Sequence, residues 1–246
     1  MSNSVVMPII GYMHSPYQEK FGIPRQPNLV QVESYIELSE PYNDLSAFEG
    51  IEDFSHLWLL WQFHDNKNTD NSLNQMSKFR PQVRPPRLGG NQKIGVFATR
   101  SMYRPSPIGL SVVRFLRVEK CAKSVRMYVT GSDLLNKTPI LDIKPYIHYS
   151  DAVMDSVSGY AQDEPIRKRV LWSELAQSIK HKFIQENDTQ PKIFDELEQV
   201  LSLDPRPAYH DDASRIYKMK FFTFDVSFNV DDENINILKL ETLNSH

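Results

Sequence analysis

"HLWLLWQFH", residues 56–64, is the stretch that decides the fold. It is a continuous run of aliphatic and aromatic side chains, which is typical of a strand buried on both faces. Further strand-like runs lie on either side of it, at residues 5–11, 29–38, 93–100, 108–118, 124–132 and 138–147. Their connections are rich in proline and glycine, and apart from a short helix expected from Asp44 they show little helical pattern. This succession predicts an antiparallel barrel or sandwich.

The pattern changes after residue 149. Apolar residues four apart between Leu171 and Phe183 predict one helix, and the run "IFDELEQVL" at residues 193–201 predicts a second. Three strand-like pieces follow, and a polar, turn-rich segment at residues 150–163 separates the two halves of the chain. We therefore expect a mainly β domain of residues 1–155 and a small α+β domain of residues 156–246.

Composition places the protein among soluble globular proteins. Of its 246 residues, 40% are hydrophobic and 24% are charged, and no apolar run approaches the roughly 18 residues of a membrane span. The N-terminus lacks the basic start of a signal peptide, and a single cysteine, Cys121, rules out an internal disulfide. These features predict a cytoplasmic protein without a membrane partner.

Positive charge is concentrated in the middle of the chain. Residues 78–126 hold twelve Lys and Arg but one acid, Glu119, although the net charge of the whole chain is -3. A local basic excess suggests an anionic partner such as a polynucleotide backbone. The alternative is a solvated basic face without a partner.

Several common catalytic designs are absent from the sequence. The glycines of "RLGGNQKIG", residues 87–95, fit neither the dinucleotide fingerprint nor the phosphate-binding loop. The seven histidines show no pair at metal-ligand spacing, and no nucleophile-elbow serine occurs. We therefore expect neither a Rossmann domain nor a metal site.

Arginine stands beside proline in four separate clusters, at residues 24–27, 84–90, 104–109 and 204–207. Proline fixes its own φ and biases the preceding residue toward extended backbone, so Arg104 and Ser106 in "RPSPIG" are held extended. An arginine positioned in this way suits a phosphate, a carboxylate or a stacked base. The alternative is a purely structural role, in which these residues shape loops and bind no ligand.

The run "LDIKPYI", residues 141–147, carries a second candidate group. Strand alternation turns Asp142, Lys144 and Tyr146 to one face, where an acid, a cation and a phenol can position and deprotonate a weak nucleophile. A salt-bridged barrel rim is the alternative. In the nearby "GSD", residues 131–133, the acid Asp133 can accept a hydrogen bond from a ribose or an ammonium group.

Five motifs together resemble one family. They are "SPYQEKFGIPRQP" at residues 15–27, "FSHLW" at 54–58, "GVFATRSMYRPSPIGLS" at 95–111, "LDIKPY" at 141–146 and "DPRPAYH" at 204–210. In this order they resemble the TsaA-like proteins, the TrmO family of tRNA adenine-N6 methyltransferases. The resemblance implies an N-terminal single-sheet β-barrel, S-adenosylmethionine as cofactor, and a homodimer. It also implies methylation of threonylcarbamoyladenosine 37 in the anticodon loop of threonine tRNA.

The resemblance also implies site residues. The family's cofactor contacts fall on Pro24, Arg25, Gln26, His64, Asp65, Arg100, Leu110, Thr130, Gly131, Ser132 and Asp133. For the methyl transfer we expect Asp142 or Tyr146 to accept the substrate proton, with Lys144 favouring the anionic form of either. We expect Arg84, Arg104 and Arg206 to hold the threonyl carboxylate or tRNA phosphates.

The sequence departs from the family pattern at two places. Ser106 stands where the family has asparagine, which puts a direct amide contact at that point in doubt. The Asn-rich connection at residues 66–78 is longer than usual and predicts an extended surface loop near the site.

Two other functions are compatible with the same residues. One is a non-catalytic module that binds S-adenosylmethionine or tRNA, and the other is a methyltransferase that acts on a small anionic molecule. The face of Asp142, Lys144 and Tyr146 favours an enzyme over a binding module. The size of the basic excess favours tRNA over a small substrate.

Overall fold

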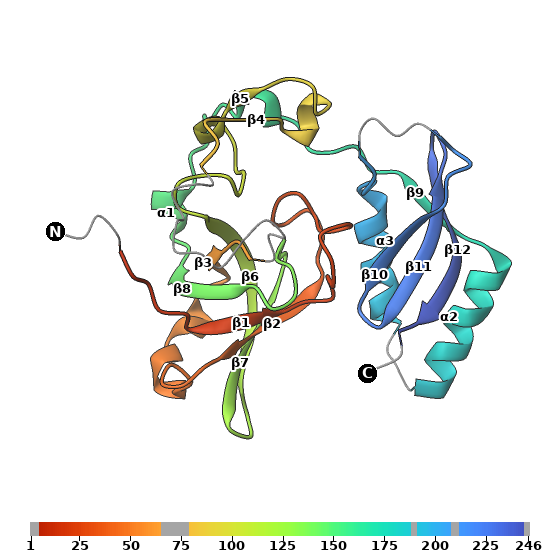
Figure 1. Ribbon diagram of the computed structural model, residues 1–246. Helices are drawn as coiled ribbons and strands as arrows, with labels where there is room; N and C mark the ends of the chain where they lie inside the picture. Colours follow the sequence, from red (N-terminus) through yellow and green to blue (C-terminus); the bar gives the residue numbers. More distant parts are fainter. Residues whose placement is uncertain (1–4, 65–78, 188–190, 208–211, 244–246) are drawn as a thin grey trace.

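The computed structural model has two lobes that lie side by side, and each is built around a large β-sheet and a hydrophobic core (Figure 1). The structure describes residues 5–64, 79–187, 191–207 and 212–243. A long linker that includes the short helix α1 (His148–Asp151) and the 3₁₀ turn η6 (Gly159–Ala161) joins the two lobes. The mainly β fold with added helices, expected from the sequence, is confirmed.

Six antiparallel strands of the N-terminal lobe form a closed barrel in the order β1-β2-β7-β6-β3-β8. Their bounds are Gly11–His14 for β1, Glu33–Leu38 for β2, His56–Gln62 for β3, Ile108–Cys121 for β6, Ser124–Thr130 for β7 and Pro139–Pro145 for β8. The ring closes because β1 pairs with β2 along one edge and with β8 along the other. The order is not sequential, so residues distant in the chain meet at the barrel mouth.

The central strand β3 is buried on one face only. Leu57, Leu59 and Trp61 point into the barrel core, whereas Trp58 and Leu60 between them are partly exposed. The sequence-based expectation of a strand buried on both faces is wrong. In a barrel wall only alternate side chains face inward, and the outward apolar residues of β3 border a cavity or neighbouring strands instead.

The connections differ in several places from the sequence prediction. The expected helix after Asp44 is a pair of 3₁₀ turns, η1 (Leu45–Phe48) and η2 (Ile51–Asp53). The run at residues 93–100 forms a two-residue strand β5 (Ile94–Gly95) and the turn η5 (Val96–Ala98). Strand β5 pairs with β4 (Gln82–Val83), which the turn η4 (Pro86–Leu88) follows, and this small unit lies over the barrel (Figure 1).

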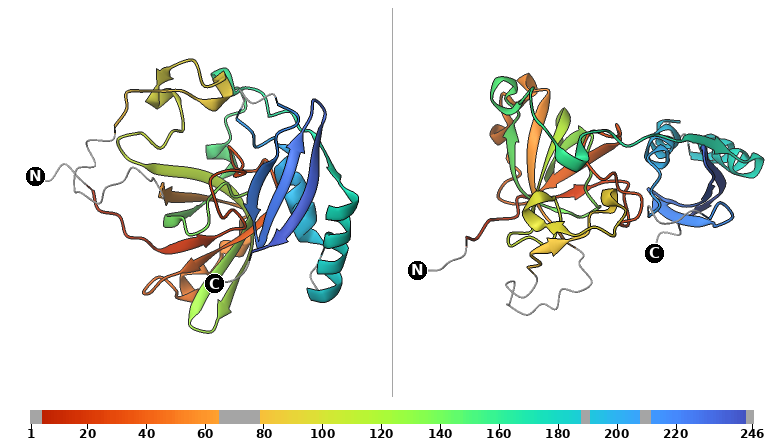
Figure 2. Two further views of the ribbon diagram at one scale, coloured as in Figure 1. Left: turned by 45° about the vertical axis from the view of Figure 1, so that its right-hand side comes forward. Right: turned by 90° about the horizontal axis from the view of Figure 1, so that it is seen from above.

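The C-terminal lobe is a four-stranded sheet in the order β10-β11-β12-β9. Strands β10 (Tyr217–Phe221), β11 (Phe224–Val230) and β12 (Asn234–Thr242) are antiparallel, and β9 (Arg169–Trp172) pairs parallel to β12. Helices α2 (Glu174–Asn187) and α3 (Lys192–Ser202) pack on one face of this sheet (Figure 2). Neither these helices nor any other in the described part of the chain is long and apolar enough to cross a membrane.

Both predicted helices and the three predicted C-terminal strands are confirmed, but strand β9 was missed. Leu171 fits the helical spacing yet lies in β9, because the helix begins only after Ser173. The Ser173 hydroxyl accepts a hydrogen bond of 3.1 Å from the backbone N–H of Ala176, as an N-cap residue does. The helical spacing of apolar residues in the sequence therefore begins before the helix itself does.

The N-terminal lobe contributes side chains to the hydrophobic core of the C-terminal lobe. Tyr17, Val30 and Val32, from the N-terminal lobe, are buried in the core of the C-terminal sheet and its helices. Helix α3 also supplies acceptors for the chain leading into β2, since the N–H of Glu33 donates to Oε1 of Glu196 over 3.0 Å. The ammonium of Lys192 lies 2.6 Å from the Glu33 carboxylate. These contacts fix α3 against the entrance of β2.

Candidate functional site

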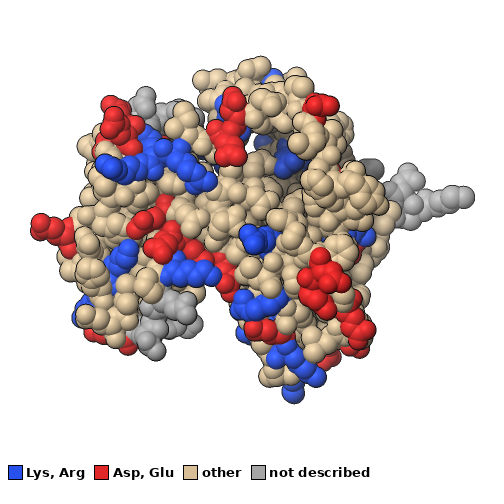
Figure 3. Space-filling model, turned by 180° about the vertical axis from the view of Figure 1, so that it is seen from behind, with Lys and Arg blue, Asp and Glu red and all other residues tan. Residues whose placement is uncertain are grey.

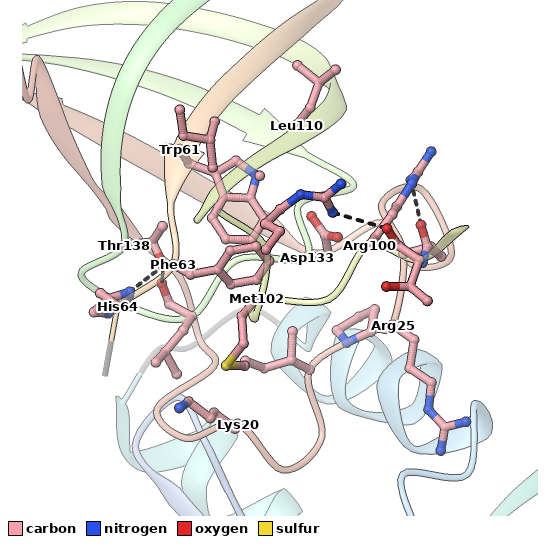
Figure 4. A pocket seen from close by; sticks show the side chains of 18 of the residues that line it. Lys20, Arg25, Trp61, Phe63, His64, Arg100, Met102, Leu110, Asp133 and Thr138 are labelled. Atoms are coloured by element: carbon pink, nitrogen blue, oxygen red, sulfur yellow. Dashed lines mark hydrogen bonds between the residues drawn. The ribbon is translucent and has the colours of Figure 1, made fainter. Parts of the chain in front are cut away.

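A cavity of about 520 Å³ opens at the mouth of the barrel (Figure 4). Its size falls in the range of about 300–1,000 Å³ that is usual for small-ligand sites. Four stretches far apart in the sequence meet there: residues 20–26, the outer end of β3, residues 99–110, and residues 133–138. The described residues that line it are Lys20, Ile23, Pro24, Arg25, Gln26, Trp58, Trp61, Phe63, His64, Thr99, Arg100, Met102, Arg104, Ile108, Gly109, Leu110, Asp133, Leu135 and Thr138.

Trp61 and Phe63 form an aromatic wall of the cavity. Their ring centroids lie 4.5 Å apart in an edge-to-face arrangement. Gly109 of β6 stands opposite Trp61 in the strand register, and a Cβ atom there would lie only 2.2 Å from the indole carbon Cε2. Only glycine leaves room for the indole in this position. The result is an apolar, aromatic part of the lining, of the kind that packs against a base or a hydrophobic group.

Asp133 is the one carboxylate among the described residues that line the cavity. The Ser111 hydroxyl donates a hydrogen bond of 2.7 Å to Oδ1 of Asp133, and the indole N–H of Trp61 donates to the same hydroxyl oxygen over 3.0 Å. Burial raises the pKa of Asp133 to about 6, although the Ser111 hydrogen bond and the charge of Arg100 oppose this shift. A cationic ligand group placed beside Asp133 would favour its charged form.

Four cations line the same cavity: Lys20, Arg25, Arg100 and Arg104. The Nη1 of Arg100 donates to Oε1 of Gln26 over 2.5 Å, and the Nη1 of Arg104 donates to the Thr99 carbonyl over 3.0 Å. Guanidinium groups held by neutral acceptors keep their charge available for an anion. The cavity therefore combines one buried carboxylate with an excess of positive charge.

His64 lies where β3 leaves the barrel, and its Nδ1 is 3.3 Å from the Thr138 hydroxyl oxygen. That hydroxyl donates its own proton to the Leu135 carbonyl over 2.7 Å, so the oxygen accepts from Nδ1–H of the imidazole. In the neutral ring this arrangement makes Nε2 the basic nitrogen. The Thr138 hydrogen bond thus favours the tautomer of neutral His64 that carries its proton on Nδ1.

Most of the cofactor residues implied by the resemblance meet in this cavity. Pro24, Arg25, Gln26, His64, Arg100, Leu110 and Asp133 line it. Thr130, Gly131 and Ser132 are buried and do not line it. They form the turn that presents Asp133, with Gly131 at φ +81° against the side chain of Asn28. Asp65 and the loop at residues 66–78 lie outside the described residues.

The expected acid-lysine-phenol group does not line the cavity. Asp142 and Lys144 do share a face of β8, as predicted, but their side chains pair with each other over 2.7 Å and are 40% and 61% exposed. The ring of Tyr146 lies 5.8 Å from that of Trp58, and Trp58 pairs with Lys144 in the strand register. Trp58 itself lines the cavity. The three residues of the group are therefore neighbours of a lining residue, but they do not line the cavity themselves.

Of the three arginines expected to hold anions, only Arg104 lines the cavity. Arg84 is exposed in the connection after β4 and is not part of the lining. Arg206 pairs with Asp204 through two nitrogens, at 2.9 and 2.8 Å. It reaches the cavity rim through its backbone carbonyl, which accepts from Nη2 of Arg25 over 3.2 Å. In Figure 4 Arg25 extends toward this loop, which follows α3.

The basic tract of residues 78–126 divides between the cavity and the barrel surface. Arg100 and Arg104 line the cavity, whereas Arg117 pairs with Glu33 and Glu119 and Arg126 pairs with Glu37. On the face shown in Figure 3, lysine and arginine side chains are interspersed with acidic ones over both lobes. On this face the positive charge forms no continuous stripe, and the tract contributes two of the four cations that line the cavity.

Sequence reasoning missed several cavity residues. Trp61 entered only as one residue of the strand expected at residues 56–64, and Lys20, Phe63, Met102 and Thr138 were not singled out. Ser106, which departs from the family pattern, is exposed and does not line the cavity. A glycine inside the strand-like run 108–118 was the available signal for a close approach at Gly109, because strand glycines often mark such contacts.

Comparison with known proteins assigns both lobes to described domains. Residues 12–152 match the tRNA-methyltransferase O N-terminal domain, and residues 167–243 match the TrmO C-terminal domain. The "tRNA (adenine(37)-N6)-methyltransferase" of Escherichia coli K12 is 37% identical over 235 residues, which cover 94% of this chain and 96% of that protein. The "Putative S-adenosylmethionine-dependent methyltransferase RcsF" of Pseudomonas aeruginosa PAO1 is 42% identical over 222 residues, covering 89% and 90%. The crystal structure of TrmO from Pseudomonas aeruginosa superposes with a TM-score of 0.77 at 34% identity, covering 97% and 98% of the two chains.

Proposed function

Because this chain belongs to the tRNA-methyltransferase O (TrmO) family, we propose that it transfers a methyl group from S-adenosylmethionine to N6 of adenine 37 in tRNA. The observation that carries the proposal is the cavity in which Asp133 lies beside an aromatic wall and four cations. The carboxylate and the aromatic wall suit a cationic nucleoside, and the four cations suit an anionic nucleotide.

The residues present fit S-adenosylmethionine. Asp133, held by Ser111 and raised in pKa by burial, offers a counter-charge for a cation. Trp61, kept in place by Gly109, and the apolar side chains of Phe63 and Leu110 offer surfaces for an adenosine. S-adenosylmethionine supplies a methyl group on a positively charged sulfur, which needs no metal for activation. The protein's contribution is then chiefly alignment of this group with the acceptor nitrogen.

The finer identity of the acceptor is part of the proposal. A threonylcarbamoyl group on adenine 37 adds a carboxylate to the phosphates of the anticodon loop. Lys20, Arg25, Arg100 and Arg104 give the cavity more positive than negative charge among its described lining residues. Arg104, on the proline-stiffened stretch before β6, is the residue that we assign to the carboxylate or a neighbouring phosphate.

We propose His64, in place of Asp142 or Tyr146, as the group that accepts the proton from N6. His64 lines the cavity, and its Nδ1 lies 3.3 Å from the Thr138 hydroxyl oxygen, so Nε2 is the ring nitrogen to which we assign the proton. The Asp142 carboxylate is paired with Lys144 outside the cavity wall. A base must reach the proton it removes, so position favours His64.

The organisation of the protein is proposed on the same grounds. We take residues 1–155 as a catalytic barrel domain and residues 156–246 as a small α+β domain, as the barrel, the four-stranded sheet and the two matched domains suggest. Large apolar side chains of the linker are 87–90% exposed at Tyr149, Met154 and Val157, which supports a homodimer that light scattering would detect. A tRNA substrate points to the cytoplasm.

Incubation with methyl-labelled S-adenosylmethionine and bulk tRNA that lacks the modification tests the function. Label in tRNA is the expected result. Bound cofactor without label in any product would instead identify a binding module. Label that appears only when a small anionic molecule replaces tRNA would identify a different methyltransferase.

A further inference from the structure

The segment 17–26 has two faces that serve two different sites. Lys20, Ile23, Pro24, Arg25 and Gln26 line the cavity of the barrel. Tyr17, Phe21 and Ile23 pack into the core of the C-terminal sheet. One stretch of backbone therefore forms a cavity wall on one side and part of the contact between the lobes on the other.

The contacts with the C-terminal sheet are close and numerous. The ring of Phe21 stacks near those of Tyr217 and Phe228, with centroids 6.3 Å from each. Gly22, at φ +91°, approaches Met219 so closely that a Cβ atom would lie 2.0 Å from the sulfur. Glycine is required here both by this contact and by the backbone conformation.

Hydrogen bonds continue the contact along the edge of the sheet. Tyr17 forms a bridge with Phe221 at the end of β10, and the N–H of Phe222 donates to the Pro16 carbonyl over 2.8 Å. The N–H of Lys220 donates to Oε1 of Glu19 over 2.9 Å. The segment thus adds to the sheet at its β10 edge.

On the cavity side the same segment positions an arginine. Gln26, at its end, accepts the 2.5 Å hydrogen bond from Nη1 of Arg100. Arg25 is held by the carbonyl of Arg206, and the Arg206 guanidinium is itself fixed by Asp204. The C-terminal lobe therefore supports Arg25 directly, and the segment that it anchors supplies the Gln26 acceptor for Arg100.

We propose that the C-terminal lobe positions the 20–26 wall of the cofactor cavity, with Phe21 as the principal positioning residue. Phe21 does not line the cavity and so acts through its neighbours. An ordered wall lowers the conformational entropy that ligand binding would otherwise cost. This inference rests on the proposed function only in taking S-adenosylmethionine as the ligand.

A matched pair of substitutions separates positioning from general stability. Phe21→Ala removes the ring that anchors the wall. Phe183→Ala removes a ring of α2 that packs on Phe194 and Phe224 in the same core, away from the wall. Both substitutions should lower the melting temperature, and Phe21→Leu provides a milder variant if Phe21→Ala does not fold.

Binding of S-adenosylmethionine is measured by titration calorimetry at a temperature at which the variants are folded. Phe21→Ala should raise Kd and KM for S-adenosylmethionine about tenfold, with kcat at saturation changed less than about twofold. Phe183→Ala should leave Kd within about twofold of the parent value. Phe21→Tyr, which keeps the ring, should restore tight binding.

Amide hydrogen exchange of residues 17–26 gives a readout that needs no ligand. Exchange there should be faster in Phe21→Ala than in Phe183→Ala when both are compared with the parent protein. Equal effects of the two substitutions on Kd and on this exchange would overturn the inference. Failure of the parent protein to bind S-adenosylmethionine would overturn the proposed function instead, and the exchange comparison would still decide the positioning role.

Discussion

The hydroxyl of Ser111 donates a hydrogen bond of 2.7 Å to the carboxylate of Asp133 at the edge of the cavity. This bond stabilises the charged form of an acid whose pKa burial raises to about 6. Asp133 is therefore neutral in mildly acidic solution and charged near neutrality. Its charge state governs how well the cavity receives a cation.

Binding of S-adenosylmethionine should depend on pH. Below the pKa of Asp133 the carboxyl must lose its proton before it can pair with the cation, so affinity should fall about tenfold per pH unit as pH drops below 6. Above about pH 7 affinity should level off. Calorimetric titrations between pH 5 and 8 measure this. In Ser111→Ala the pKa of Asp133 should rise further, and the midpoint should move to higher pH; an unchanged midpoint would contradict the assignment.

Gly109→Ala should distort the aromatic wall. The new Cβ would lie 2.2 Å from Cε2 of Trp61, so the indole must move, at a cost of about 1–3 kcal/mol in stability and with a large loss of cofactor affinity. Gly95→Ala is the matched control, because no atom lies within 4 Å of its added Cβ. Denaturant unfolding and calorimetry measure the two effects. Equal behaviour of the two variants would refute the role of Gly109.

Arg104→Ala should reduce the salt dependence of tRNA binding. Loss of one phosphate contact lowers the slope of log K against log salt by about one. If Arg104 binds the threonyl carboxylate instead, the slope should persist, and affinity for tRNA that lacks this group should be unchanged. Arg117→Ala serves as control, because Arg117 is paired with Glu33 and Glu119 on the barrel surface. Filter binding over a range of salt concentrations gives the slopes.

His64→Gln should lower kcat by about 100-fold or more while leaving S-adenosylmethionine binding within a few-fold. Glutamine can still donate to the Thr138 hydroxyl but has no basic nitrogen. Asp142→Asn breaks an ion pair outside the cavity and should leave kcat nearly unchanged. Single-turnover rates measure both. The reverse result, with turnover lost only in Asp142→Asn, would contradict His64 as the base and identify Asp142 of β8 instead.

The sequence predicted individual residues of this site better than it predicted how those residues come together in space. The proline-arginine clusters identified Arg25 and Arg104, since stiffened backbone beside a cation is visible in a short window, and the family resemblance added Arg100. Their convergence with Asp133 depends on a barrel order in which β7 lies between β2 and β6, and local patterns do not encode such pairing.

Some of the expected site residues do not line the cavity, for physical reasons. Asp142, Lys144 and Tyr146 were assigned to the site from strand alternation, which fixes a common face but not what that face borders; here Trp58 lies beside them in the wall. Arg206 was expected to bind an anion, but an acid two residues earlier, Asp204, holds its guanidinium. The ring contacts of Phe21 could not be predicted, because its partners lie about 200 residues further along the chain.

The most direct test is mass spectrometry of the nucleosides of purified threonine tRNA after incubation with the protein and methyl-labelled S-adenosylmethionine. The proposed function predicts that threonylcarbamoyladenosine gains one labelled methyl group, and that Asp133→Asn loses most of this product. A parent protein that binds S-adenosylmethionine tightly yet leaves every nucleoside of the tRNA unlabelled would contradict it.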